Sequence, residues 1–285
     1  MRKFPLLLIA ATAILFASCN KQKTNDDTSA AFGQDENLVT LVFSPYTMEP
    51  IRDGRGIEVV NRLDVWLIEG DNVYDFHQLK TETTSFGTFH ITLNRTKTYS
   101  LIAVGHKAEG EAALSDGIIS FPNDKVTHSM FYTTTFTPAN TTTLNCEMLR
   151  IVGNFRFTIT DELPAEVDHM KFIISESGTR FDVVNQIATN KIERVSIPNS
   201  MNPNTNGTYT FNVYIMADEM DEISEFDITA QAIDENEGII EEHSFSEVPI
   251  KNGWQTSYTG TFFVTEPMTI NFTVGGWESF DEQPY

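Results

Sequence analysis

TFHITL, at residues 88–93, alternates apolar and polar side chains without interruption. Successive side chains of a β-strand point to opposite faces, so Phe89, Ile91 and Leu93 share one face and the polar residues share the other. The apolar face is expected to enter a core, while the polar face meets water. This two-residue period predicts a β-strand.

The same pattern recurs along most of the chain. Turn-forming pairs such as Ser177-Gly178 and Asn206-Gly207 lie between the alternating stretches, and no stretch carries a long apolar stripe at helical spacing. The further predicted strands are residues 38–44, 62–70, 98–105, 129–137, 150–160, 169–175, 209–217, 226–234, 258–265 and 268–274. The sequence therefore predicts an all-β protein.

About a dozen short strands rich in Thr, Phe and Val exceed what one small β-sandwich holds and suit two. The best boundary follows the Thr-rich passage TTTFTPANTTTLNCEM and precedes the strongly alternating RIVGNFRFTIT. We therefore expect an N-terminal β-sandwich at residues 38–149 and a C-terminal β-sandwich at residues 150–285. Whether the Thr-rich run is strand or linker stays open.

The N-terminus carries an export signal. Residues 1–18 give a charged start, an apolar run too short to span a bilayer permanently, and small residues at the end, which is the order of a signal peptide. Cys19 follows Phe-Ala-Ser, and this junction resembles the lipobox of bacterial lipoproteins. In that class the cysteine carries diacylglycerol, and several acyl chains hold a protein firmly at a membrane. The alternative is an ordinary signal peptide with a chance cysteine.

Residues 19–37 are then the lipidated cysteine and a polar, flexible tether. Asp26 and Asp27 in this tether resemble the surface-export signals of Bacteroidetes lipoproteins. A plain soluble linker explains the same two residues, and both interpretations stay open.

Charge and cysteine content narrow the function classes. The 285-residue chain has a formal net charge of −21, and loss of Arg2 and Lys3 leaves 17 − 40 = −23 for the mature protein. A field of this sign repels phosphate backbones, which argues against nucleic-acid binding. Once Cys19 is lipidated, Cys146 has no partner for an intrachain disulfide.

Motifs for catalysis, cofactors or metals are not evident. The sequence has no G-x-S-x-G, no P-loop and no dinucleotide fingerprint, and its six histidines do not fall at metal-ligand spacing. The acidic stretches 218–227 and 234–238 lack the ligand spacing of a calcium loop. We therefore expect a protein that is not an enzyme and that holds no cofactor or metal.

Several segments resemble one family in the same order along the chain. LRIVGNFRFTITDELPAEVDHMKFIIS is similar to the segment that opens the second domain of the FimB/Mfa-like fimbrial lipoproteins, in the fimbrillin superfamily of Bacteroidales. RLDVWLIEGDNVYDF and TYSLIAVGH resemble strands of the first domain. VPIKNGWQTSYTGTFF and TINFTVGGWESFDEQPY resemble the final strands. The resemblance covers the lipid signal, both domains and the C-terminus.

The resemblance implies a fold and a role. The fold would be two tandem transthyretin-like Greek-key β-sandwich domains behind a lipoprotein signal peptide. The role would be fimbria anchoring, assembly or adhesion at the outer membrane, with other fimbrial subunits bound by strand addition. Polymerising members lose their first strand when a protease cuts after an arginine, and Arg52 and Arg55 are the candidates here. Anchor-type members keep this strand.

A second function class remains. Exposed tryptophans stack on sugar rings, so a surface glycan-binding lipoprotein serving an outer-membrane nutrient importer is the alternative. Trp254 and Trp277 would be its ligand-stacking residues. Trp66 lies opposite the Leu63, Val65 and Leu67 face of its strand, and is core if both faces of that strand are covered.

Overall fold

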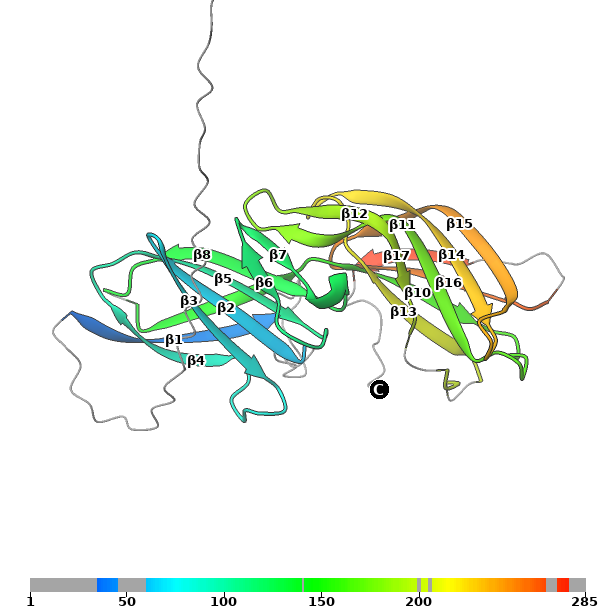
Figure 1. The fold of residues 1–285 in the computed structure, drawn as a ribbon, viewed down its shortest axis with the longest axis horizontal. Helices are drawn as coiled ribbons and strands as arrows, with labels where there is room; N and C mark the ends of the chain where they lie inside the picture. Colours follow the sequence, from blue (N-terminus) through cyan, green and yellow to red (C-terminus); the bar gives the residue numbers. More distant parts are fainter. Residues whose placement is uncertain are drawn as a thin grey trace, which may run out of the picture. The chain divides into compact units, whose positions relative to one another are not determined.

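The computed structural model describes residues 35–45, 60–139, 141–198, 201–204, 207–264 and 271–276. Within these ranges the regular structure is β-strand apart from one short 3-10 turn, η2, at Pro122–Asp124. The strands are β1 (Glu36–Pro45), β2 (Arg62–Glu69), β3 (Asn72–Leu79), β4 (Thr88–Asn94), β5 (Tyr99–His106), β6 (Ala113–Ser115), β7 (Ile118–Ser120), β8 (Met130–Phe136), β9 (Thr143–Arg150), β10 (Gly153–Ile159), β11 (His169–Asp182), β12 (Ile187–Ser196), β13 (Tyr209–Ile215), β14 (Ile223–Ile233), β15 (Ile239–Lys251), β16 (Trp254–Gly260) and β17 (Asn271–Gly276). The predicted all-β class is confirmed (Figure 1).

Seven strands form the first sheet, in the order β3-β2-β5-β8-β9-β1-β4. Strands β8 and β9 pair only at Met130–Arg150 and Phe131–Leu149, so this is the weakest link in the sheet. One core cluster receives side chains from both sides of this link, among them Leu41 of β1 and Leu67 of β2. The sheet therefore closes over its own apolar face.

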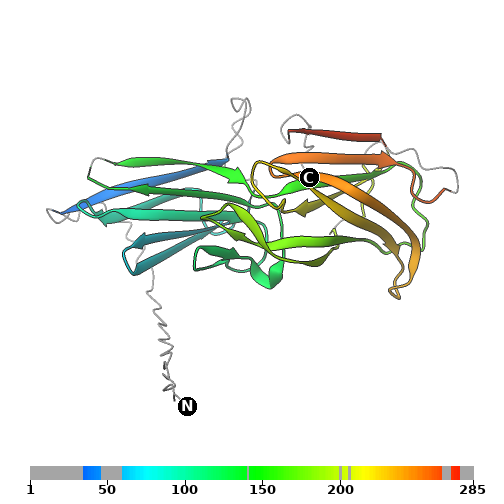
Figure 2. The ribbon, with the colours of Figure 1, turned by 90° about the horizontal axis from the view of Figure 1, so that it is seen from above.

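Two further sheets enclose a second core. A four-stranded sheet has the order β13-β10-β16-β17, and a six-stranded sheet has the order β15-β14-β11-β7-β6 with β12 paired to β11. Phenylalanines dominate the core between them, and Phe155, Phe157 and Phe172 are all buried there. The two sheets form layers on either side of this core (Figures 1 and 2).

The connection between β5 and β8 reaches across to the six-stranded sheet. Its hairpin β6–β7 pairs with the end of β11, where Ile118, Ile119 and Ser120 lie opposite Asp182, Phe181 and Arg180. A third core cluster mixes residues from before and after position 150. Consistent with this, the described residues belong to one compact unit.

Strand ends differ from the predictions where polar contacts intervene. The strand predicted at 258–265 begins at Trp254 and ends at Gly260. The Asp161 carboxylate accepts hydrogen bonds from the main-chain N–H groups of Phe262 (2.8 Å) and Phe263 (2.7 Å), which holds this segment away from a ladder.

Strands β12 and β15 are absent from the sequence prediction. In β12, Asn190 has a positive φ of 54°, and the register with β11 shifts between Ile174 and Ser177. In β15, Glu247 has a φ of 54° and the register shifts twice against β14. These irregularities break the two-residue period by which a strand is recognised in a sequence.

Candidate functional site

Strand β1 lies inside its sheet, although it is the first described strand of the chain. It pairs antiparallel with β4, where Leu41 lies opposite Phe89, and parallel with β9, where Leu41 lies opposite Leu144. Both edges of β1 are therefore occupied by neighbouring strands. Its removal would leave two facing strand edges without a partner.

The inward side chains of β1 fill the first core. Val39 and Leu41 are fully buried and Phe43 is 3% exposed, which agrees with the alternation of the sequence. The rings of Phe43 and Phe89 meet edge to face with centroids 5.7 Å apart. This geometry is favourable for aromatic pairs, so β1 contributes apolar packing as well as strand pairing.

Polar contacts fix both the register and the start of β1. The Asn37 amide donates hydrogen bonds to the carbonyl oxygens of Pro138 (2.6 Å) and Thr141 (3.1 Å). Thr40 Oγ1 and His90 Nδ1 lie 3.1 Å apart on the outer face. These contacts tie β1 to the segment before β9 and to β4, which sets a single pairing register.

Cys146 lies opposite Phe43 in the β1–β9 ladder and is fully buried. Burial raises the pKa of its thiol to about 12. The reactive thiolate is therefore scarce at neutral pH, and Cys146 acts as a small core residue rather than a nucleophile.

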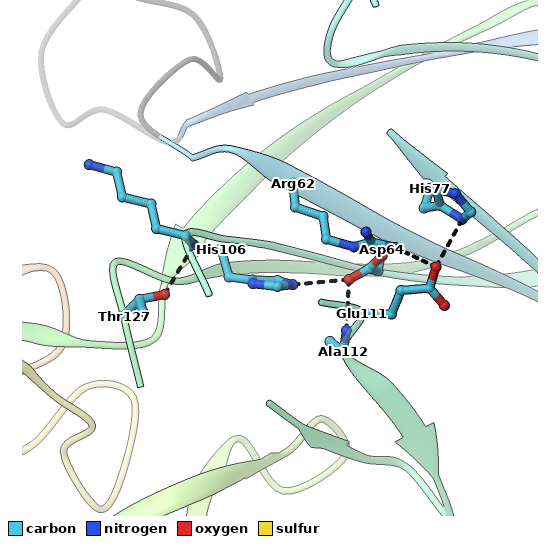
Figure 3. Close-up of polar contacts among 8 residues, drawn as sticks. Arg62, Asp64, His77, His106, Glu111, Ala112 and Thr127 are labelled. Atoms are coloured by element: carbon cyan, nitrogen blue, oxygen red, sulfur yellow. Dashed lines mark hydrogen bonds and ion pairs between the residues drawn. The ribbon is translucent and has the colours of Figure 1, made fainter. Parts of the chain in front are cut away.

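A second feature is a buried polar cluster at the base of the β5–β8 connection (Figure 3). The Asp64 carboxylate is 4% exposed and is the hub of the cluster. Asp64 Oδ1 accepts from Arg62 Nε (2.7 Å), while Oδ2 accepts from the Ala112 main-chain N–H (2.9 Å) and lies 3.0 Å from His106 Nε2. Three donors thus satisfy one buried carboxylate, as burial of a charge requires.

Glu111 extends this cluster toward solvent. Its Oε1 lies 2.9 Å from an Arg62 guanidinium nitrogen and 3.7 Å from His77 Nδ1. His106 is fully buried, and its Nδ1 has no hydrogen-bond partner among the described residues. Nε2 is therefore the ring nitrogen through which His106 contacts Asp64. The hydrogen bonds of Asp64 join β2, β5 and the β5–β8 connection.

The sequence reasoning missed Arg62, Asp64 and His106. The available signal was the strand RLDVWLIEG, in which Arg62 and Asp64 share a face with Trp66. Once Trp66 is core, a charge beside it on the same face must find partners.

Most of the predicted site residues lie outside the described part of the chain. These are Cys19, Arg52, Arg55 and Trp277. Trp254 begins β16 and is partly buried, with Lys251 Nζ 5.1 Å from the centroid of its ring. Trp66 is 7% exposed and belongs to the third core cluster, which settles it as a core residue. His90 is exposed as expected.

No group of three or more His, Cys, Asp or Glu among the described residues is placed to hold a metal ion. The described ranges also contain no helix with the length and apolar character needed to cross a bilayer.

Solved structures share this fold at low sequence identity. A candidate adhesin from Bacteroides thetaiotaomicron matches with a TM-score of 0.52 and 11% identity, over 85% of this chain and 97% of that chain. A candidate polysaccharide-binding protein from the same organism gives 0.52 and 12%, over 85% and 96%. A candidate adhesin from Bacteroides ovatus gives 0.50 and 15%, over 85% and 95%.

Sequence comparison gives a more specific result. No curated protein sequence matches this chain. The family model of the fimbrillin-A associated anchor proteins Mfa1 and Mfa2 matches residues 34–281, which include every described strand. The segments noted in the two predicted domains, apart from the last four residues of the final one, thus lie within one continuous match to the fimbrial family that they resemble. The chain belongs to the family of fimbrillin-A associated anchor proteins.

Proposed function

We propose that this protein is a lipid-anchored subunit at the base of a fimbria, held at the outer membrane through Cys19 and bound to other fimbrial subunits by β-strand contacts. Membership of a fimbrial anchor family supports the role. The signal peptide and the Phe-Ala-Ser-Cys junction support the lipid and the surface location. The role is structural rather than catalytic.

The proposal includes the domain division. Residues 38–149 and 150–285 would each form a transthyretin-like Greek-key sandwich behind a tether at residues 19–37. Separate apolar cores in the two parts support this division. The hairpin β6–β7 pairs with β11, so a fragment that begins at residue 150 would lack two strands of its six-stranded sheet.

The observation that carries the proposal is the place of β1 between β4 and β9. A chain that keeps β1 has both edges of this strand paired and the inward side chains buried, so it stays attached to its lipid-bearing N-terminus. A chain cut after Arg52 or Arg55 could lose β1. It would then present an apolar groove flanked by two strand edges, which is what a partner strand fills. We favour the uncut anchor form.

The experiment that tests the anchor role changes Cys19 to Ala in the cells that make the protein. The protein and its fimbrial material should leave the surface and appear in the medium, because the acyl chains are the only attachment in the proposal. Asn20→Ala, one residue later, is the matched control and should leave attachment intact. Unchanged retention of the Cys19→Ala protein would refute the anchor role.

A second candidate function rests on one structural neighbour. A protein of the same fold is described as a candidate polysaccharide-binding protein. In this chain Trp254 is partly exposed, and its ladder partner is Gly276. Trp277 follows Gly276 in the sequence. Glycan-array binding that is lost in Trp254→Ala, yet kept in the control Tyr74→Ala, would favour glycan binding. If the unaltered protein binds no glycan, glycan binding is ruled out and only the fimbrial proposal remains.

A further inference from the structure

The connection between β5 and β8, residues 107–129, has the form of a strap with two fixed ends; we call it the strap. Its near end closes on itself, since the Lys107 main-chain N–H donates to Thr127 Oγ1 at 3.0 Å. Its far end reaches β11 through the short strand β7. The strap thus bridges the seven-stranded sheet and the six-stranded sheet.

The near end is held chiefly by charge. Ala112 donates its main-chain N–H to buried Asp64, and Glu111 forms an ion pair with Arg62. Hydrogen bonds to charged groups are stronger than neutral ones, and loss of one partner leaves the others buried and unsatisfied. Asp64 of β2 bonds to Arg62 of the same strand, to His106 of β5 and to Ala112 of the strap.

The far end is held by few contacts. Strand β7 pairs with only three residues of β11, Arg180–Asp182. Asp124 accepts a hydrogen bond from Thr179 Oγ1 at 3.2 Å and lies 3.7 Å from Arg180 Nε. Along its whole length the strap also buries four apolar side chains in the third core cluster, Ala112, Ile119, Phe121 and Val126.

The strap consists of turns and short strands. Asp116, Asn123 and Asp124 have positive φ values of 51°, 54° and 52°, a region that Asp and Asn adopt more readily than other residues with a side chain. Strands β6 and β7 have three residues each. A segment of turns and three-residue strands lacks stability of its own and depends on its two attachments.

We propose that the strap is a releasable clamp between the two sheets and that Asp64 is its lock. Opening frees β6, β7 and η2 as one unit, while the cores between the remaining strands stay folded. The opened chain exposes the edge of β11 at residues 180–182 and the apolar face of Trp66 and Phe131 that the strap covers. The clamp depends neither on Cys19 nor on family membership, so a failed test of the clamp leaves the anchor role unaffected.

Hydrogen exchange of the full chain, read by mass spectrometry across a series of low denaturant concentrations, tests the clamp. Amides at 112–120 should exchange through an opening that depends weakly on denaturant, whereas β10 and β13 should exchange only on global unfolding. Asp64→Asn should speed exchange at 112–120 by about tenfold or more, because it weakens hydrogen bonds to a charged group. Exchange in β10 and β13 should stay within about twofold.

Control variants make the result decisive. Asp75→Asn removes the same charge from an exposed position on β3 and should change nothing. If Asp64→Asn does not fold, Asp124→Asn at the far end and Glu111→Gln at the near end carry the same test. The clamp is refuted if the strap exchanges in step with β10 and β13 in every variant that folds.

A reversible cross-link provides a second readout. Ser120 and Arg180 are Cα partners in an antiparallel ladder, where such residues are about 4.5–5.5 Å apart and suit a disulfide. Ser120→Cys with Arg180→Cys, in the variant that opens the strap, should restore slow exchange when oxidised and lose it on reduction. Fast exchange that persists in the oxidised form would contradict the proposal.

Discussion

Strand β1 and the strap both join distant parts of the chain, yet different forces hold them. β1 has ladders on both edges and three inward side chains, Val39, Leu41 and Phe43, in one core. The strap has three-residue strands, and its Ala112 main-chain N–H donates a hydrogen bond to the buried Asp64 carboxylate of β2. Apolar burial and strand pairing resist local release, whereas a charged lock can be undone by one change. β1 is therefore a fixed part of the fold, whereas the strap is the part that we propose can open.

The largest expected effect is the loss of stability when the packing of β1 is disrupted. Leu41→Ala deletes a fully buried side chain between two ladders and should lower the free energy of unfolding by about 2–5 kcal/mol. Denaturant unfolding followed by tryptophan fluorescence measures it. Leu38→Ala, at a position 37% exposed on the same strand, is the matched control and should stay within about 0.5 kcal/mol. Equal effects of the two changes would mean that β1 is not packed as described.

Cys146, opposite Phe43 of β1, reports whether β1 and the strap open independently. This thiol should resist maleimide labelling in the native chain, since it is buried and its pKa is raised to about 12. Phe43→Ala should speed labelling by roughly tenfold, because it removes the ring opposite Cys146 and weakens β1. Asp64→Asn should leave the labelling rate unchanged, since the strap lies outside this core. Faster labelling in both variants would show that the two elements open together.

Buried His128, which contacts Tyr214 and Arg150, should make the stability of the fold sensitive to acid. His128 is buried and stacks on Tyr214 with ring centroids 5.6 Å apart. Its Nε2 accepts a hydrogen bond from Arg150 Nε at 3.3 Å. Burial first, and then the charges of Arg150 and Lys107, hold the pKa of His128 well below its ordinary value. As pH falls below about 6.5, the His128 imidazole therefore takes up a proton in the unfolded chain before it does so in the folded protein.

The free energy of unfolding should accordingly fall below pH 6.5, by at most about 1.4 kcal/mol per pH unit from this one group. Unfolding measured at pH 7.5, 6.5 and 5.5 tests the slope. His128→Phe keeps an aromatic ring against Tyr214 and should flatten the pH dependence in this window. An unchanged slope in His128→Phe would assign the acid sensitivity to other groups.

The smallest effect is expected at a surface ion pair. Lys97 Nζ lies 3.1 Å from Glu69 Oε1 near the ends of β2 and β5, and the Lys97 side chain is about half exposed. Such pairs contribute between about 0 and 1 kcal/mol. Lys97→Ala should therefore shift the unfolding midpoint only slightly. A loss as large as that of Leu41→Ala would overturn the ranking of forces used for β1 and the strap.

Strands with a clean two-residue period were predictable from the sequence. β1 and β4 follow their alternation closely, since one face of each meets an apolar core. β5 was predicted from the same pattern, but both of its faces are buried. The turn at Gly70, where φ is 57°, was also readable from its residues. These features depend on local sequence and on one buried face.

The strap and its lock depend on tertiary contacts that sequence does not display. Asp64 and His106 are 42 positions apart, and nothing local marks them as partners. The strands β6 and β7 have three residues each, too few to show a period, and exist because β11 offers an edge. The lipid site and the arginines, in contrast, are read from sequence alone and stay predictions.

The measurement that tests the anchor role most directly is the intact mass of the protein purified from cells. The anchor role predicts one species that begins at the lipid-bearing Cys19 and retains β1. A mature species that lacks lipid and begins after Arg52 or Arg55 would contradict it.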